Sequence, residues 1–103
     1  MQQVVSQLLS VAPKITTDMG QPKMDEAVAL LDALSHPLPA DDIAALMSLL
    51  PSDGDDACGL NWTILHSVEA SPHWPPWDLL GDRENEWVDT FLIRLENAGI
   101  RRS

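Results

Sequence analysis

Runs of apolar residues at helical spacing, each broken by proline or glycine, constrain the fold of this chain more than any other feature. In residues 2–12, Val4, Val5 and Leu8 recur at the spacing that lines one face of a helix. Pro13 ends this run, because proline lacks a backbone donor and restricts the residue before it. Nothing along the chain alternates with period two for long enough to predict a strand. The sequence therefore predicts an all-α fold.

The same pattern of breaks predicts about five main helices. We expect them over residues 2–12, 22–36, 40–50, 60–70 and 82–98, with one short turn over 77–81. The second helix is expected to bury Met24, Ala27, Val28, Leu31 and Leu34. Short links between helices favour antiparallel neighbours. We therefore expect a single domain, residues 1–103, of antiparallel helical hairpins packed as a HEAT-like bundle.

The last predicted helix has the clearest ends. Asp82 is expected to be its N-cap, and Gly99 its C-terminal stop. Arg101 and Arg102 follow, where positive charge suits the negative end of the helix dipole.

Residues 59–87 hold all four tryptophans of a chain that has one phenylalanine and no tyrosine. They are Trp62, Trp74, Trp77 and Trp87. Each indole can bury a large apolar area, so this segment is expected to supply most of the bulky core contacts. An aromatic box that stacks on a ligand is the alternative interpretation.

The charge of the chain narrows its possible partners. Sixteen acidic and six basic side chains give a formal net charge of -10, which excludes ordinary nucleic-acid binding through clustered Lys and Arg. Residues 41–82 contain eight acidic side chains and no Lys or Arg. Such a segment is either a solubilising surface or a surface that steers a basic partner. The candidate partner-binding residues are Asp41, Asp42, Asp53, Asp55, Asp56 and Asp78.

The carboxylates in this set differ in their local surroundings. Asp41 and Asp42 fall in the first turn of a predicted helix, where they complement its dipole. Asp53, Asp55 and Asp56 crowd into a loop that offers no comparable local role, so they are expected to repel one another. Replacing these three with asparagine is therefore expected to leave the fold intact or slightly more stable.

No sequence motif predicts catalysis, and we expect no enzyme activity, cofactor or metal. GxGxxG, P-loop, GxSxG, CxxC and HExxH patterns are absent. A metal-dependent hydrolase using His66, Glu69 and His73 is a third hypothesis, but Pro72 interrupts the helix between these ligands. The acidic loop lacks the spacing of a calcium-binding EF-hand loop.

Bulk features also predict where the protein acts. The single cysteine, Cys58, excludes an internal disulfide and favours a reducing compartment. No stretch approaches the roughly 20 apolar residues that a membrane-spanning helix needs. We expect a cytoplasmic protein without membrane contact, whose oligomeric state the sequence does not predict.

Two segments of the C-terminal half carry a family resemblance. The first, NWTILHSVE at residues 61–69, has the form NWxxLHxxE and runs into a tryptophan–proline corner. The second, at residues 85–99, has the form NEWxxxxxxRxxNAG. Together they resemble small bacterial immunity proteins of polymorphic toxin systems, although glycine is common in that pattern where His73 stands. The motif residues are Asn61, Trp62, His66, Glu69, Trp74, Trp87 and Arg94.

The resemblance implies a small acidic helical domain that binds and neutralises a cognate, basic toxin domain by direct, non-catalytic contact. The alternative is an acidic helical adaptor or regulatory subunit that binds another basic protein. The motif residues also have a structural interpretation. Arg94 is expected to pair with Glu69 or with carboxylates on the Glu96 side, across two helices. Asn61 is expected to cap or bridge to a neighbouring backbone group.

Overall fold

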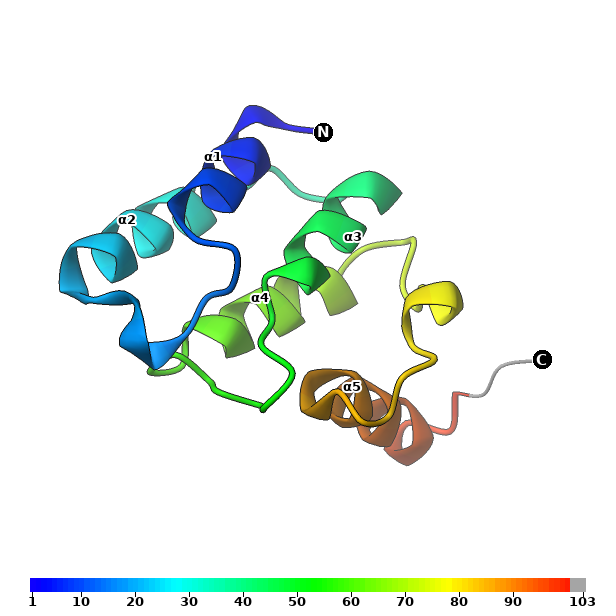
Figure 1. The fold of residues 1–103 in the computed structure, drawn as a ribbon. Coiled ribbons are helices and arrows are strands. Elements are labelled where there is room, and N and C mark those ends of the chain that lie inside the picture. The colour runs from blue at the N-terminus through cyan, green and yellow to red at the C-terminus, as the bar shows by residue number, and fades with distance from the viewer. Residues whose placement is uncertain (101–103) are drawn as a thin grey trace.

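The computed structural model describes residues 1–100, whose Cα positions span 42 × 26 × 18 Å (Figure 1). Its α-helices are α1 (Gln3–Val11), α2 (Gln21–Asp32), α3 (Ala40–Ser48), α4 (Leu60–Glu69) and α5 (Glu86–Asn97). Two 3-10 helices, η1 (Thr17–Met19) and η2 (Trp77–Leu79), lie in the linkers. These residues contain no strand, which confirms the all-α class. Across residues 1–100, no helix has the length and apolar character needed to span a bilayer.

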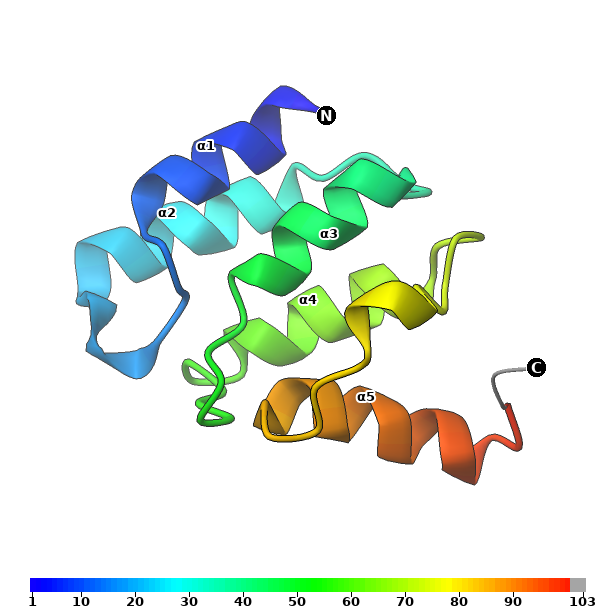
Figure 2. The same cartoon turned by 45° about the vertical axis from the view of Figure 1, so that its right-hand side comes forward.

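The first four helices follow one another in antiparallel order (Figures 1 and 2). α1 packs most extensively along α2, and α3 lies against α1 and α4. α5 departs from this order, because the linker over residues 70–85 carries the chain back before α5 begins. As a result, α5 runs in roughly the same direction as α4 (Figure 2). The antiparallel neighbours expected from the short links are present, whereas HEAT-like stacking is not confirmed.

The N-terminal boundary of α5 differs from the prediction. Asn85 is the N-cap, and its Oδ1 accepts hydrogen bonds from the backbone N–H groups of Trp87 (3.0 Å) and Val88 (3.2 Å). The prediction of Asp82 as N-cap is wrong. The backbone N–H of Glu86 donates instead to the carbonyl of Ser52 (2.9 Å), a long-range bond that fixes where the helix starts.

The C-terminal stop of α5 is confirmed at Gly99. Gly99 has a φ of 75°, a left-handed conformation that glycine adopts without a steric cost. Its N–H donates to the carbonyl of Glu96 (3.0 Å), and the N–H of Ile100 donates to that of Leu95 (2.9 Å). This pair of bonds is a Schellman motif. The expected role of Arg101 and Arg102 lies outside the described residues.

The core is mainly aliphatic rather than built from tryptophan. Its largest fully buried side chains include Leu8, Leu38, Ile43, Leu46, Ile64, Leu65 and Phe91. Among the tryptophans only Trp87 is buried, whereas Trp62 is 39% exposed and Trp74 and Trp77 are partly buried. The expectation that this segment dominates the core is therefore wrong. Trp74 and Trp77 lie in the proline-rich linker after α4 and pack against the core from there, and Trp62 contacts the buried Trp87 while staying partly exposed.

The buried face of α2 is narrower than its apolar pattern predicts. Ala27 and Leu31, and then Leu34 beyond the helix, are buried as expected. Val28, however, is 44% exposed, so its prediction as a core residue is wrong. Val28 borders an open groove between α2 and the start of α4, which leaves its side chain exposed.

Truncation of core side chains tests this packing. Leu65→Ala and Trp87→Ala should each lower the free energy of unfolding by about 2–5 kcal/mol, the usual range for large-to-small core changes. Ile93→Ala on the exposed face of α5 is the control and should change it by less than about 0.5 kcal/mol. Chemical denaturation measures all three. Equal effects of Leu65→Ala and Ile93→Ala would contradict the assigned core.

Candidate functional site

The acidic loop, residues 52–59, connects α3 to α4, and its own carboxylates stabilise its backbone conformation. Asp53 Oδ1 accepts from the backbone N–H of Asp55 (3.0 Å), and Asp56 Oδ1 accepts from that of Cys58 (3.2 Å). Aspartate commonly stabilises turns by accepting from a backbone N–H two residues ahead. The expectation that Asp53, Asp55 and Asp56 lack a local role is therefore wrong. The loop is a built structure, not a set of carboxylates that only repel one another.

Asp55 has the most hydrogen bonds of the three. Its Oδ2 accepts from the backbone N–H of Thr17 (3.0 Å), while its Oδ1 accepts from the Thr17 hydroxyl (2.6 Å) and the N–H of Ala57 (2.8 Å). The Thr17 hydroxyl, followed by the backbone N–H groups of Thr17 and Ala57, lowers the pKa of Asp55 below its ordinary value. Asp55 therefore fastens the η1 segment to the acidic loop.

The backbone carbonyl of Asp55 joins the loop to α4 and α5. It accepts from Asn61 Nδ2 (2.9 Å) on α4 and from Trp87 Nε1 (3.0 Å) on α5. Asn61 Nδ2 also donates to the carbonyl of Ile15 (2.9 Å), and Asn61 is fully buried. The bridge expected of Asn61 is thus present. Its Oδ1 has no hydrogen-bond partner among the described residues.

A left-handed turn ends the acidic loop. Ala57, Cys58 and Gly59 have φ values of 50°, 58° and 91°. Positive φ is uncommon for residues other than glycine and costs conformational energy. The hydrogen bonds from Ala57 N–H to Asp55 and from Cys58 N–H to Asp56 offset that cost. The turn is followed directly by the first residue of α4.

Four of the seven motif residues of the family resemblance connect α4 and α5. Trp62 meets Trp87 edge to face, with ring centroids 5.2 Å apart. Seven residues further along each helix, Arg94 Nε and Nη2 each donate to a carboxylate oxygen of Glu69 at 2.8 Å. This bidentate ion pair raises the pKa of Arg94 and confirms the expected pairing. The equal offset of the two contacts means that α4 and α5 lie parallel.

The remaining motif residues have simpler surroundings. Trp74 packs on Phe91 of α5, with ring centroids 4.9 Å apart. His66 is exposed on α4, and His73 is exposed in the following linker. Glu69 is already paired with Arg94. No three His, Cys, Asp or Glu side chains gather in a metal-binding arrangement anywhere in residues 1–100.

The six predicted partner-binding carboxylates do not form one surface. Asp41 and Asp42 lie in the first turn of α3, and the acidic loop leaves its other end, about 13 Å away along the helix (Figure 2). Asp78 is an exposed residue of η2. Asp41 Oδ2 lies 2.9 Å from the N-terminal amine, which lowers the pKa of Asp41.

The prediction that Asp42 binds a partner is wrong. Its side chain is fully buried, and its Oδ1 and Oδ2 accept from the backbone N–H (3.3 Å) and the Nε2 (2.9 Å) of Gln2. These bonds attach the start of α1 to α3. Asp42 therefore has a structural role that the sequence pattern did not reveal.

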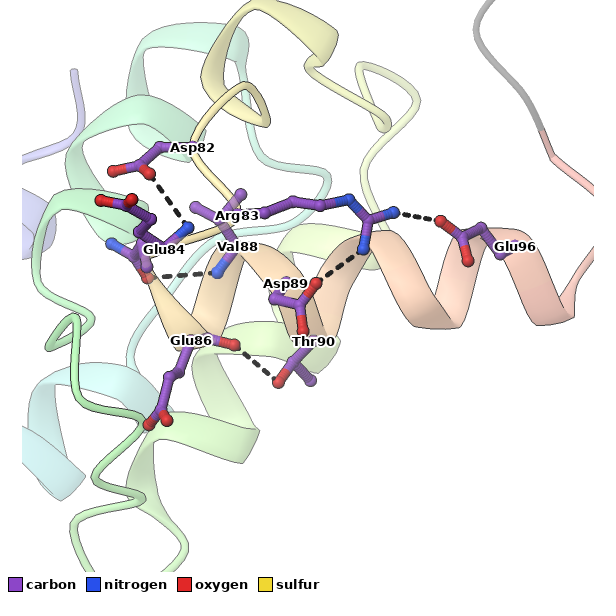
Figure 3. Close-up of polar contacts among 9 residues, drawn as sticks. Asp82, Arg83, Glu84, Glu86, Val88, Asp89, Thr90 and Glu96 are labelled. Carbon is purple, nitrogen blue, oxygen red and sulfur yellow. Dashed lines mark hydrogen bonds and ion pairs between the residues drawn. The ribbon is translucent and has the colours of Figure 1, made fainter.

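Arg83 precedes α5, and its side chain extends along the helix toward Asp89 and Glu96 (Figure 3). Its guanidinium pairs with Asp89 at 2.7 Å and also with Glu96. These contacts raise the pKa of Arg83, with Glu96 making the largest contribution. Arg83 and Arg94 are therefore both paired within the chain, so neither balances the other carboxylates at the surface.

Sequence reasoning missed a groove between α2 and the start of α4. Its volume is about 350 Å³, and its lining includes the exposed Val28, the left-handed turn, and Asp25 and Asp32. In the sequence, only Val28 pointed to this groove, because it makes the apolar face of α2 wider than the face that is buried in the core.

No protein-family model, curated protein or solved structure matches the chain.

Asp55→Asn tests the role of the loop carboxylate. At neutral pH the variant should unfold at a lower denaturant concentration. Thr17 donates to both carboxylate oxygens of Asp55, and asparagine keeps only one oxygen that can accept. The lowered pKa means that the stabilisation by Asp55 is complete above the unfolded-state value of about 3.9. It should be lost as pH falls through the folded-state value.

Unfolding curves measured from neutral to acidic pH check this prediction. The gap between wild type and Asp55→Asn should close in acid. Asp53→Asn is the control, since its Oδ1 can still accept from Asp55 N–H. A gap that stays constant with pH would contradict the role of the Asp55 charge.

A double-mutant cycle tests the Glu69–Arg94 pair. Alanine substitutions at both positions should reveal a coupling free energy of about 0.2–1 kcal/mol, as is usual for exposed ion pairs. The coupling should shrink with added salt, which screens exposed charges. A cycle between Glu69 and Arg83 serves as the control and should show none. Equal couplings in the two cycles would count against a specific pair.

Proposed function

We propose that this protein is a cytoplasmic immunity protein that binds and neutralises a cognate bacterial toxin by direct, non-catalytic contact. The observation that carries the proposal is the acidic loop, which presents the exposed carboxylates of Asp53 and Asp56 on a backbone fixed by hydrogen bonds. The two motif segments that resemble immunity proteins support it further. The partner is a basic protein domain.

Electrostatics supports a basic partner. The chain has a net charge of -10, and Arg83 and Arg94 already pair with carboxylates of the same chain. The exposed carboxylates therefore produce a field of one sign, which accelerates encounter with a positively charged protein. Asp53 and Asp56 are the proposed contacts of the acidic loop, and Asp41 and Asp78, elsewhere on the surface, add to the steering field. Asp42 and Asp55 are not part of the proposed contact.

Binding without catalysis fits the chemistry of the proposed surface. Asp53 and Asp56 are held by backbone N–H groups rather than by a partner that activates them as acids or bases. A protein of this kind acts by covering the toxin, so its effect is stoichiometric. We therefore expect a stoichiometric complex with the toxin, and the product of a neighbouring gene is the candidate toxin to test.

Co-purification tests the proposal. The tagged protein, coexpressed with the product of the adjacent gene, should form a stable complex and protect cells from that product. The Asp53→Asn/Asp56→Asn variant should fold normally but associate more slowly, because it lacks part of the steering field. Rapid-mixing kinetics at several salt concentrations measures the association rate, which should fall as salt rises.

Asp82→Asn/Glu84→Gln is the matched control, because it removes the same charge from the segment before α5. It should associate faster than the loop variant. If both variants protect cells as wild type does and association is insensitive to salt, the acidic loop is only a solubilising surface. A stable complex with a basic protein that is not toxic would favour the adaptor alternative.

A further inference from the structure

The groove between α2 and α4 has an apolar interior. The buried side chains of Leu31, Ala57 and Leu60 line it, together with the partly buried Met24 and the exposed Val28. Its volume of about 350 Å³ is at the lower end for small-molecule pockets. Because the groove is bounded by the length of one helix and the start of another, its shape suits a helix laid along it better than an enclosed ligand.

Val28 is the least expected residue of this groove. At 44% exposure it is one of the few large hydrophobic side chains that are exposed in residues 1–100. Residues one turn away on the same helix, Met24 and Leu31, also line the groove. The apolar surface of α2 therefore continues from the core to the outside of the molecule, where a second apolar surface can bury it.

The charged residues of the groove carry a single sign. Asp25 and Asp32 line it, and no Lys or Arg does. Two turns of α2 separate these aspartates, a distance of about 10 Å along the axis. Asp25 accepts from the neutral amide of Gln21 (2.7 Å), which leaves its charge uncompensated by that contact. At the end of the groove, Asp56 accepts from the N–H of Cys58, another lining residue.

We infer that this groove is the docking site for an amphipathic, basic helix of the cognate toxin. The apolar residues of that helix, spaced three to four apart, contact Met24, Val28 and Leu31. Its Lys or Arg residues, two turns apart, meet Asp25 and Asp32. The inference rests on the proposed function, and it joins the apolar groove to the acidic loop in one continuous interface.

Occupancy of the groove can be measured at Cys58. It is exposed, lines the groove and is the only cysteine of the chain, so its alkylation by neutral iodoacetamide reports occupancy at one position. The first probe is a synthetic helix of about 18 residues with leucine on one face and lysine on its flanks. The second probe has glutamate in place of each lysine. The lysine peptide should slow alkylation of the full-length protein, and the glutamate peptide should not.

Variants distinguish binding of the lysine peptide in the groove from non-specific attraction between opposite charges. Val28→Ser should weaken lysine-peptide binding by about tenfold through lost apolar contact, whereas Ile93→Ser, at a residue of nearly equal exposure (45%), should not. Asp25→Asn/Asp32→Asn should weaken it by about twofold to thirtyfold. Asp82→Asn/Glu84→Gln should have a smaller effect. Equal effects of Val28→Ser and Ile93→Ser would overturn the inference.

The toxin itself distinguishes the two proposals. If the product of the adjacent gene forms a complex and Cys58 becomes protected, with protection reduced by Val28→Ser, the docking site is supported. If the complex forms but Cys58 reacts at its free rate, the docking site is wrong and the proposed function stands. If no complex forms while the lysine peptide still protects Cys58, the toxin partner is wrong, and the groove binds a basic helix of another origin.

Discussion

Asp55 connects parts of the chain that lie far apart in sequence. Its carboxylate accepts from Thr17 in η1, and its backbone carbonyl accepts from Asn61 on α4 and Trp87 on α5. Because Asn61 is fully buried and also binds the carbonyl of Ile15, the same bonds satisfy polar groups inside the molecule. The acidic loop is thus the junction on which the positions of η1, α4 and α5 depend.

The attachment of α5 shows why this junction matters. α5 makes no extensive helix–helix packing comparable to that of α1 and α2, and it is held chiefly by individual side chains. Trp87 and Phe91 enter the core, and Arg94 pairs with Glu69 at the outer edge. The Trp87 indole is buried in the core and also donates a hydrogen bond to the carbonyl of Asp55. The burial holds the first turn of α5 against the core, and the directional hydrogen bond fixes its orientation.

Local signals predicted the helices because their causes are local. Proline, glycine and apolar spacing act within a few residues, and each α-helix matches its expected segment to within four residues at either end. The second helix, expected over 22–36, is α2 at Gln21–Asp32. The failures have long-range causes. Asp42 has the position of a dipole-complementing surface residue, but it is buried, and its partner Gln2 is 40 positions away in the sequence. Asn85 replaces Asp82 as N-cap because Glu86 binds Ser52 across the fold. The spacing of α2 predicted burial for Val28, but spacing does not reveal that a groove between α2 and α4 stays open beside it. In the candidate site the sequence indicated the acidic loop, but not that its carboxylates hold a turn.

A preformed acidic loop changes the energetics of the proposed complex. Because Asp55 and Asp56 already fix the loop backbone, little conformational entropy remains to be lost when a partner binds. The left-handed turn then has two sides with different properties. One side continues into exposed carboxylates, which act over several ångströms and raise the association rate. The other side, through Cys58, borders the apolar groove of Val28. In the proposed complex, short-range contact there would slow dissociation. In the proposed complex, a strained turn held by aspartates would thus bring long-range steering and short-range docking into one surface, an arrangement that a freely moving acidic tail would not provide.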